Sequence, residues 1–252
     1  MKALVTRPRD DAAALVRALG ERGIESILAP MLTILPTAHA ARHLAECLTG
    51  AQAVLFTSAN GVRAFAAASP RRELPVLAVG DASAAAARIA GFRSVASAGG
   101  DVDDLVDLVA AHLSPKGGAL VHAAGMTVAG DLAGRLGALG FAVHRATLYE
   151  AVPAAALDPD TAAAMRRGGA ALALFFSPRT ATTFVRLAAA AGVEDACRAM
   201  AAIALSPAVA AALAALSWRT VRVAAKPREG DLLAALDAFL AEGAAQQGFS
   251  GA

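Results

Sequence analysis

Short apolar runs alternate with longer amphipathic segments along most of the chain. The apolar runs include KALVT, AVLFT, PVLAV, GALVHA, ALALFF and MAAIAL, and each precedes a segment in which apolar residues recur at helical spacing. Runs of this length between turn residues indicate buried strands, and apolar residues three or four apart indicate helices. A regular alternation of strand and helix favours parallel sheets that helices cover on both faces. We therefore predict an α/β fold.

Two extended segments interrupt this alternation. Residues 30–37 (PMLTILPT) and 148–153 (LYEAVP) are bounded by proline, which favours extended backbone at its own position and at the one before it. We expect linkers at residues 35–37 and 148–152. They divide the chain into a discontinuous first lobe and an inserted second lobe, made of residues 1–34 with 153–252 and of residues 38–147. Because the chain would cross twice between the lobes, we expect a hinge with a cleft.

The two predicted lobes share an internal repeat. LFTS ends at Ser58 and LFFS ends at Ser177, and each is followed at the same distance by a phenylalanine, Phe65 or Phe184. The pairs AVGDASAAAA with ALSPAVAAAL and VDDLVDLV with EGDLLAAL extend the likeness. Such repetition predicts two similar lobes, each a parallel β-sheet flanked by helices, joined by a two-stranded extended connector. The alternative is that any two α/β halves look alike in an alanine-rich chain.

Composition and charge exclude several classes of protein. Hydrophobic residues make up 57% of the chain, but much of that share is alanine, and no run approaches the roughly 20 apolar residues of a membrane span. The first apolar run passes directly into charged residues, so we expect neither a membrane segment nor a secretory signal. The net charge is +2, and the basic residues are dispersed arginines with few lysines. This pattern argues against nucleic acid and favours a small anionic ligand.

The sequence lacks the usual cofactor and metal signatures. No strand is followed by GxGxxG and the chain has no GxxxxGK[ST], so we expect no nucleotide cofactor. Cys47 and Cys197 form no CxxC pair, which disfavours a disulfide framework and favours a cytoplasmic protein. His39, His43 and Cys47 are spaced by four residues along one predicted helix, too far apart to converge on one ion. We expect no metal site there.

His122 lies in the strand-like run GALVHAAG, and two interpretations of it stay open. As a strand residue it could approach the cleft. The more common case is a histidine that is satisfied inside the fold. No arrangement of the histidines predicts a Ser-His-Asp or Cys-His site.

Polar side chains follow several of the predicted strands. In an open parallel sheet these corners lie at the carboxyl ends of the strands, where helix N-termini offer unpaired N–H groups to anions. Corners that face one cleft would hold several carboxylates of one ligand. The alternative is that each Ser, Thr or Asn only caps its helix, which is worth about 1 kcal/mol. The candidate ligand-binding residues are Thr6, Arg7, Thr57, Ser58, Asn60, Gly61, Ser83, Ser177 and Thr180.

Tyr149 is the only tyrosine of the chain and lies in the second predicted linker. We expect its ring to face the space between the lobes. A protonated phenol donates a hydrogen bond, so this residue could help a hydroxyl group to leave. The alternative is a hinge residue whose ring only packs.

Taken together, these motifs resemble the uroporphyrinogen-III synthase family of the tetrapyrrole pathway. The resemblance rests, in order, on LVTRP, PMLTILP, FTSANGV followed by Phe65, AVGDASAAAA, GGDVDDLVDLV, GFAVHRATLYE, FFSPRTATTF and KPREGDLLAAL. It covers residues 1 to about 240. It implies two α/β lobes on a two-stranded connector, a cytoplasmic monomer and no cofactor.

The resemblance also implies a reaction, a lyase step that closes the linear tetrapyrrole hydroxymethylbilane into a ring. The hydroxyl of the hydroxymethyl group leaves as water, and the resulting cation attacks the already substituted carbon of ring D. A spiro intermediate then fragments and closes with that ring inverted, whereas closure without the enzyme leaves the ring uninverted. The substrate would come from the preceding enzyme of the pathway.

Site residues follow from the resemblance position by position. Tyr149 matches the family's linker tyrosine and would assist loss of the hydroxyl group. The corner positions that would contact substrate are Thr57, Ser58, Asn60, Ser83 and Ser177, with Gly125 at a further corner. Relatives often have an arginine beside the position of Gly125, where this chain has alanine, and a threonine where this chain has Ser83. The first departure weakens the case for a side-chain contact at the Gly125 corner.

A second hypothesis is a non-enzymatic hinge-binding protein whose two lobes close on an acidic metabolite. The repeat and the double crossing suit such a protein as well as they suit an enzyme. Periplasmic proteins of that kind carry a signal peptide, and sensors usually carry an output domain, neither of which the sequence suggests. We therefore favour the synthase.

Overall fold

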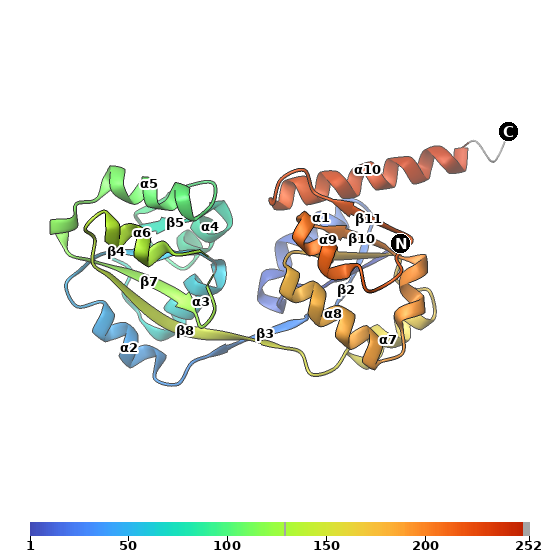
Figure 1. The fold of residues 1–252 in the computed structure, drawn as a ribbon, viewed down its shortest axis with the longest axis horizontal. Helices are drawn as coiled ribbons and strands as arrows, with labels where there is room; N and C mark the ends of the chain where they lie inside the picture. Colours follow the sequence, from blue (N-terminus) through green and yellow to red (C-terminus); the bar gives the residue numbers. More distant parts are fainter. Residues whose placement is uncertain (129, 249–252) are drawn as a thin grey trace. The chain divides into compact units, whose positions relative to one another are not determined.

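The alternating segments of the sequence form two β-sheets, and helices cover both faces of each sheet (Figure 1). The structure, a computed structural model, describes residues 1–128 and 130–248. The chain divides into two compact units. Unit 1 holds residues 1–33 and the described residues from 153 onward, and unit 2 holds residues 34–152. The predicted α/β fold with parallel strands is confirmed.

Unit 1 is built on a five-stranded parallel sheet. In spatial order its strands are β11 (Thr220–Val223), β10 (Ala201–Ala204), β9 (Leu172–Phe175), β1 (Lys2–Val5) and β2 (Glu25–Leu28). Buried side chains of α7 (Pro159–Arg166), α8 (Pro178–Ala190) and α9 (Pro207–Leu213) cover one face. Those of α1 (Ala13–Gly20) and α10 (Glu229–Gly248) cover the other. The short helices η1 (Arg9–Asp11) and η3 (Glu194–Ala199) complete the unit.

The second sheet has six strands. In spatial order they are β3 (Leu32–Pro36), β8 (Val143–Pro153), β7 (Ala119–Gly125), β4 (Ala51–Phe56), β5 (Val76–Ala78) and β6 (Val95–Ser97). The pairs from β8 to β6 are all parallel. One face packs against α2 (Ala40–Cys47), α3 (Ala59–Ala68) and α4 (Asp81–Ile89). The other packs against α5 (Val102–His112) and α6 (Leu132–Ala138), and η2 (Pro115–Gly117) precedes β7.

The apolar character of the strands follows from burial on both faces. In β4, Val54 and Phe56 point toward α2, α3 and α4, while Ala53 and Leu55 point toward α5 and α6, and all four are fully buried. A strand covered on both sides has no solvent face, so it reads as a continuous apolar run. Among the described residues, no helix has the length and apolarity that crossing a membrane requires.

The repeat seen in the sequence is a repeat of structure. When β1, β2, β9, β10 and β11 are matched with β7, β8, β4, β5 and β6, the two sheets have the same strand order. Each core holds three neighbouring aromatic rings, those of Phe56, Phe65 and Phe92 in unit 2 and of Phe175, Phe184 and Trp218 in unit 1. The prediction of two similar lobes is therefore confirmed, down to the packing of the repeated phenylalanines.

The two extended segments that interrupt the sequence pattern are neighbouring strands. β3 and β8 carry the chain between the units and lie next to each other in the sheet (Figure 1). Just beyond β3, the Thr37 N–H donates to the Leu148 carbonyl over 3.0 Å, and the Thr37 hydroxyl donates to the Thr147 carbonyl over 2.8 Å. The predicted two-stranded connector thus places Tyr149 on a strand that is hydrogen-bonded on both sides.

Candidate active site at the strand ends of unit 2

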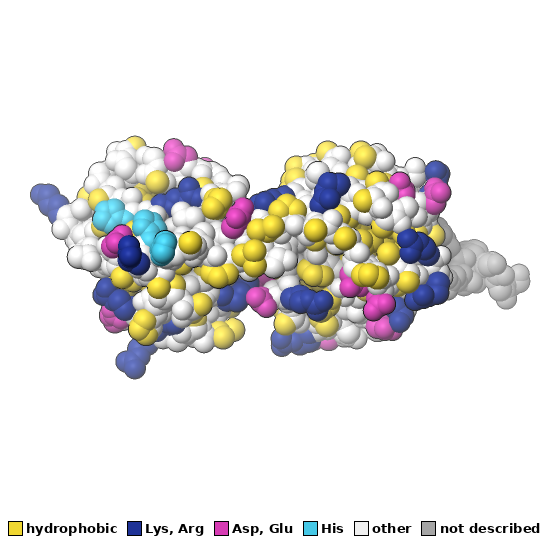
Figure 2. Space-filling model, turned by 90° about the horizontal axis from the view of Figure 1, so that it is seen from below, with side chains coloured by type: hydrophobic (Ala, Val, Ile, Leu, Met, Phe, Trp, Pro, Cys, Tyr) yellow, Lys and Arg dark blue, Asp and Glu magenta, His cyan; other side chains and the backbone are white. Residues whose placement is uncertain are grey.

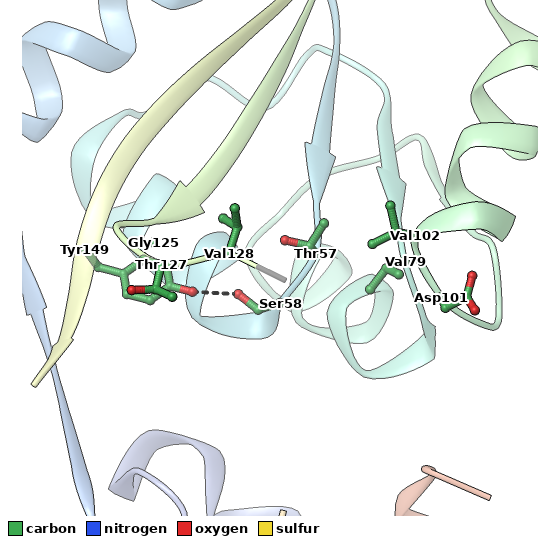
Figure 3. A pocket seen from close by; sticks show the side chains of 9 residues that line it. All are labelled: Thr57, Ser58, Val79, Asp101, Val102, Gly125, Thr127, Val128 and Tyr149. Carbon is green, nitrogen blue, oxygen red and sulfur yellow. Dashed lines mark hydrogen bonds between the residues drawn. The ribbon is translucent and has the colours of Figure 1, made fainter. Parts of the chain in front are cut away.

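The carboxyl ends of the unit 2 strands surround a cavity of about 250 Å³ (Figure 3). Its wall comes from the ends of β4, β5 and β7, the loop after β7, Tyr149 within β8 and the N-terminus of α5. This is the edge of a parallel sheet at which ligands bind in open α/β folds. The lining residues are Thr57, Ser58, Val79, Asp101, Val102, Gly125, Thr127, Val128 and Tyr149.

The Tyr149 phenol is held between two strand ends. Tyr149 lies opposite Gly125 in the pairing of β8 with β7, and its Oη is 3.0 Å from Ser58 Oγ (Figure 3). A Cβ at position 125 would lie only 2.8 Å from ring carbons Cε2 and Cζ of Tyr149. Only glycine leaves room for the ring there. The two contacts fix the phenol beside the corner that follows β4.

Ser58 both caps a helix and lines the cavity. It is the N-cap of α3, and its Oγ accepts a hydrogen bond from the Gly61 N–H over 3.0 Å. A Cβ at Gly61 would lie 2.6 Å from the Ala123 carbonyl oxygen, so glycine lets the first turn of α3 pack directly on β7. A hydroxyl has one proton and two lone pairs. Capping therefore leaves Ser58 able to bond Tyr149 as well.

Thr57 is bonded to a buried histidine. His122 lies on β7, is 3% exposed, and has its Nε2 3.1 Å from Thr57 Oγ1. Burial, together with the positive charge of Arg145, lowers the pKa of His122 to about 4. The imidazole is therefore neutral at physiological pH. Of the two interpretations left open by the sequence, the structure supports the buried histidine with a hydrogen-bond partner inside the fold. That partner, Thr57, is itself a cavity residue.

Sequence reasoning missed the part of the wall that lies beyond β5 and β7. Asp101 is the N-cap of α5, where it accepts hydrogen bonds from the N–H groups of Asp103 and Asp104. Two glycines and an aspartate before an apolar helix are a signal that could have identified this corner. Thr127 and Val128 lie in the loop after β7, and no comparable pattern marks them.

Arg145 holds the beginning of that loop. Its guanidinium donates hydrogen bonds to the carbonyl oxygens of Gly125 and Met126 over 2.7 Å and 2.6 Å. Arg145 lies on β8, four residues before Tyr149. The same strand thus supplies the phenol and fixes the turn against which the phenol packs.

Three residues of unit 2 expected from the sequence to contact the ligand lie outside the cavity wall, namely Asn60, Gly61 and Ser83. Asn60 accepts a hydrogen bond from the guanidinium of Arg63 over 2.7 Å. Ser83 lies on the inward face of α4 and is 5% exposed. Gly61 takes part through its N–H bond to Ser58 and its close packing.

The β1 corner of unit 1 is closed by its own contacts. Thr6 is fully buried, and its hydroxyl donates to the Leu174 carbonyl over 2.6 Å. The Arg7 guanidinium pairs with the Glu229 carboxylate and lies over the Phe176 ring, 4.2 Å from the centroid. Arg7 is thereby held in place, half buried, beside the strand end.

The β9 corner of unit 1 repeats the cap of the β4 corner. Ser177 is the N-cap of α8, and its Oγ accepts a hydrogen bond from the Thr180 N–H over 3.2 Å. The hydroxyls of Ser177 and Thr180 are 2.7 Å apart. Thr180 is 4% exposed, so Ser177 is the more accessible of the two.

His39, His43 and Cys47 do not share one face of α2. His39 has a left-handed backbone (φ 61°) just before α2, so it leaves the helix face shared by His43 and Cys47. His43 Nε2 lies 3.2 Å from the Arg145 carbonyl and 3.9 Å from Cys47 Sγ. Histidines gather on the face of unit 2 seen in Figure 2. Within the part of the chain that the structure describes, however, no three His, Cys, Asp or Glu residues are grouped to hold an ion.

Comparison with known proteins identifies a family model and a set of solved structures. The model described as uroporphyrinogen-III synthase HemD matches residues 13–234. The chain is similar to the uroporphyrinogen-III synthetase structure from Helicobacter pylori, with a TM-score of 0.61 and 15% identity over 94% of this chain and 98% of that one. It is also similar to a mutant uroporphyrinogen III synthase from Thermus thermophilus, with a TM-score of 0.55 and 19% identity over 98% and 99% of the two chains. No curated protein matches the sequence.

The lowered pKa of His122 predicts an acid-sensitive fold. Between the pKa of about 4 in the folded chain and the ordinary histidine pKa of 6.5, the unfolded chain binds the proton and the folded chain does not. The stabilisation is therefore complete above pH 6.5 and is lost as the pH falls from 6.5 to 4, by on the order of 3 kcal/mol. Urea unfolding at pH 7 and pH 4 measures this loss. His122→Gln should show a smaller loss, and an equal loss in both proteins would contradict the prediction.

Proposed function

Because the chain belongs to the uroporphyrinogen-III synthase family, hydro-lyases of tetrapyrrole biosynthesis, we propose that its reaction takes place at the strand-end cavity of unit 2. The family implies hydroxymethylbilane as the substrate. The observation that carries the proposal is the hydroxyl pair of Ser58 and Tyr149, 3.0 Å apart in the cavity wall. A hydrogen-bonded phenol there can act on the group that must leave.

The hydroxyls of Ser58 and Tyr149 continue a series of hydrogen bonds that begins at a backbone N–H of α3. The Gly61 N–H donates to Ser58 Oγ, and we assign the Ser58 proton to the bond with Tyr149 Oη. The Tyr149 proton is then directed into the cavity. Each acceptor in such a chain becomes a stronger donor, and the chain begins at the positive end of a helix dipole. The Tyr149 phenol thus presents a strengthened donor to the cavity, as assistance to a departing hydroxyl group requires.

The chemical step follows from that polarity. The phenol gives its proton to the hydroxyl oxygen as the bond between that oxygen and carbon breaks, so the hydroxyl leaves as water and Tyr149 becomes a phenolate. The electron pair of the broken bond goes with the oxygen, so positive charge remains on the pyrrole that carried it. The proton that the pyrrole loses when the ring closes returns to the phenolate, so Tyr149 ends the reaction protonated. The cavity wall then has to hold the two ends of the tetrapyrrole in the one arrangement that inverts ring D. Such positioning is a large catalytic effect, worth up to several kcal/mol.

The acetate and propionate groups of the substrate need many donors. In unit 2 we assign the substrate carboxylates to Thr57, Thr127 and the backbone at Gly125. Asn60 and Gly61 would support the corner after β4, and Ser83 the corner after β5. In unit 1 we assign the carboxylates to Arg7 and Ser177, with Thr180 bonded to the Ser177 hydroxyl and Thr6 fixing the β1 corner. Arg7 would exchange its Glu229 partner for a substrate carboxylate, a bond between charged groups that is stronger than a neutral hydrogen bond.

We further propose a cytoplasmic monomer that receives its substrate from the enzyme that makes it. Both cysteines are free and buried, as suits a reducing compartment. Direct delivery would limit the time in which the free tetrapyrrole can close without inversion.

The first test is the identity of the ring that forms. The purified protein, supplied with freshly prepared hydroxymethylbilane, should give predominantly the type III isomer, measured by chromatography after oxidation to the porphyrins. A reaction without protein supplies the type I reference. Type I product alone, with the tetrapyrrole still bound, would instead favour the non-enzymatic binding protein.

The second test removes the phenol while keeping the ring. Tyr149→Phe retains the packing against Gly125 and loses the donor, so kcat should fall roughly 100-fold, the low end of the effect of a positioned proton donor. Ser58→Ala should lower kcat as well, and the double variant should be little worse than Tyr149→Phe, since both act through one chain. Thermal unfolding checks that each variant folds. Unchanged turnover in Tyr149→Phe would make Tyr149 a packing residue.

A further inference from the structure

The bond between His122 and Thr57 is a second polar contact behind the cavity wall. His122 lies opposite Leu55 in the pairing of β7 with β4, so the imidazole lies beside the strand that leads into Thr57. Its Nε2 is 3.1 Å from Thr57 Oγ1, and only 3% of the residue is exposed. Thr57 in turn lines the cavity. The buried histidine therefore reaches the cavity only through the threonine.

Unit 1 shows what the fold alone requires at these two positions. The repeat matches LFTS with LFFS, so Leu174 corresponds to Leu55 and Phe176 corresponds to Thr57. The residue opposite Leu174 in the sheet is Val5, which is fully buried and corresponds to His122. The same architecture is thus built with valine and phenylalanine. A buried polar pair is therefore not needed for the sheet, and in unit 2 one member of the pair lines the cavity.

The proton of the pair has two possible arrangements, and they differ in what they offer a ligand. A neutral imidazole carries its proton on one of its two nitrogens. If Thr57 donates to Nε2, its lone pairs are left to face the cavity. If Nε2–H donates to Thr57, the threonine proton is free to point into the cavity. An acidic substrate requires the second arrangement, because a carboxylate accepts hydrogen bonds and donates none.

We propose that His122 is a positioning residue, whose Nε2–H fixes the Thr57 hydroxyl as a donor to a substrate carboxylate. A free threonine hydroxyl turns among several staggered positions, and the bond to His122 selects one of them. The neutral imidazole adds no charge to the cavity and so does not compete for the carboxylate. This inference rests on the proposed function, since it names the group that the cavity binds.

The first experiment determines the tautomer of His122 in the whole protein. Long-range ¹H–¹⁵N correlation spectra distinguish a protonated Nε2 from a protonated Nδ1, with His122→Gln used to assign the signal. We expect a neutral ring protonated at Nε2. A ring protonated at Nδ1 would overturn the proposal, and the result does not depend on whether the protein turns over its substrate.

The second experiment is a kinetic cycle with hydroxymethylbilane. Thr57→Val and His122→Val should each raise KM roughly tenfold with little change in kcat, because a carboxylate contact serves the substrate and the transition state alike. The double variant should resemble Thr57→Val alone. Val5 of unit 1 indicates that valine fits at position 122. Thr57→Ser and His122→Gln keep the hydroxyl and an N–H donor, so they should recover most of the affinity.

Thr183→Val is the matched control. It removes a hydroxyl of the same kind, which donates to the Arg179 carbonyl within α8 of unit 1, and it should leave KM unchanged. If the KM increases caused by His122→Val and Thr57→Val multiply in the double variant, the two residues do not act through one contact. That result would overturn the proposal. Type III product from the wild-type protein, measured alongside, separates a failure of this inference from a failure of the proposed function.

Discussion

The hydrogen bond between Ser58 and Tyr149 joins two segments that are far apart in the chain, and the arrangement of the cavity depends on it. Ser58 can take part because it caps α3 and is fixed by the Gly61 N–H. Tyr149 can take part because glycine at position 125 leaves space for its ring. Each partner is thus placed by a feature of the backbone: a helix begins at one, and two strands pass closely at the other. A parallel sheet brings such strand ends to one edge, which is why polar groups from distant segments meet there.

The duplicated architecture separates what the fold needs from what the site needs. Both units have the same strand order, a serine at the start of the equivalent helix and three packed aromatic rings. They differ at the strand ends. Unit 2 has Thr57 and His122 where unit 1 has Phe176 and Val5, and unit 1 places Arg7 over Phe176. The common features stabilise the sheet, whereas the differences determine what each unit can bind.

Much of the fold could be predicted from the sequence, because strands that are buried on both faces appear in it as continuous apolar runs. Strands covered on both sides are apolar throughout, the connector strands are marked by proline, and the repeated phenylalanines mark the repeated core. Ser58 became a candidate because it follows a predicted strand, and Tyr149 because of its place in the connector and the family resemblance. The sequence could not show that the two touch, since local patterns do not encode the distance between the end of β4 and Tyr149 of β8.

Other parts of the site could not be predicted either, because they too depend on contacts between distant segments. Ser83 is a candidate because it follows a strand, but helical periodicity turns it toward the core. Thr6 follows a strand too, yet its hydroxyl bonds the neighbouring strand β9. No sequence pattern marks Thr127 and Val128. They reach the cavity because they follow β7, and the position of the end of β7 depends on the folded sheet. The role of His122 depends on its neighbour across the sheet, and register is not visible in one strand alone.

The most direct test of the account is a crystal structure of the protein with a linear tetrapyrrole that retains its terminal hydroxymethyl group but cannot close. We expect the hydroxyl oxygen of that group within hydrogen-bond distance of Tyr149 Oη, in the cavity formed by the strand ends of unit 2. A tetrapyrrole bound with its hydroxymethyl end away from Tyr149 and Ser58 would contradict the central claim, whatever the activity of the protein.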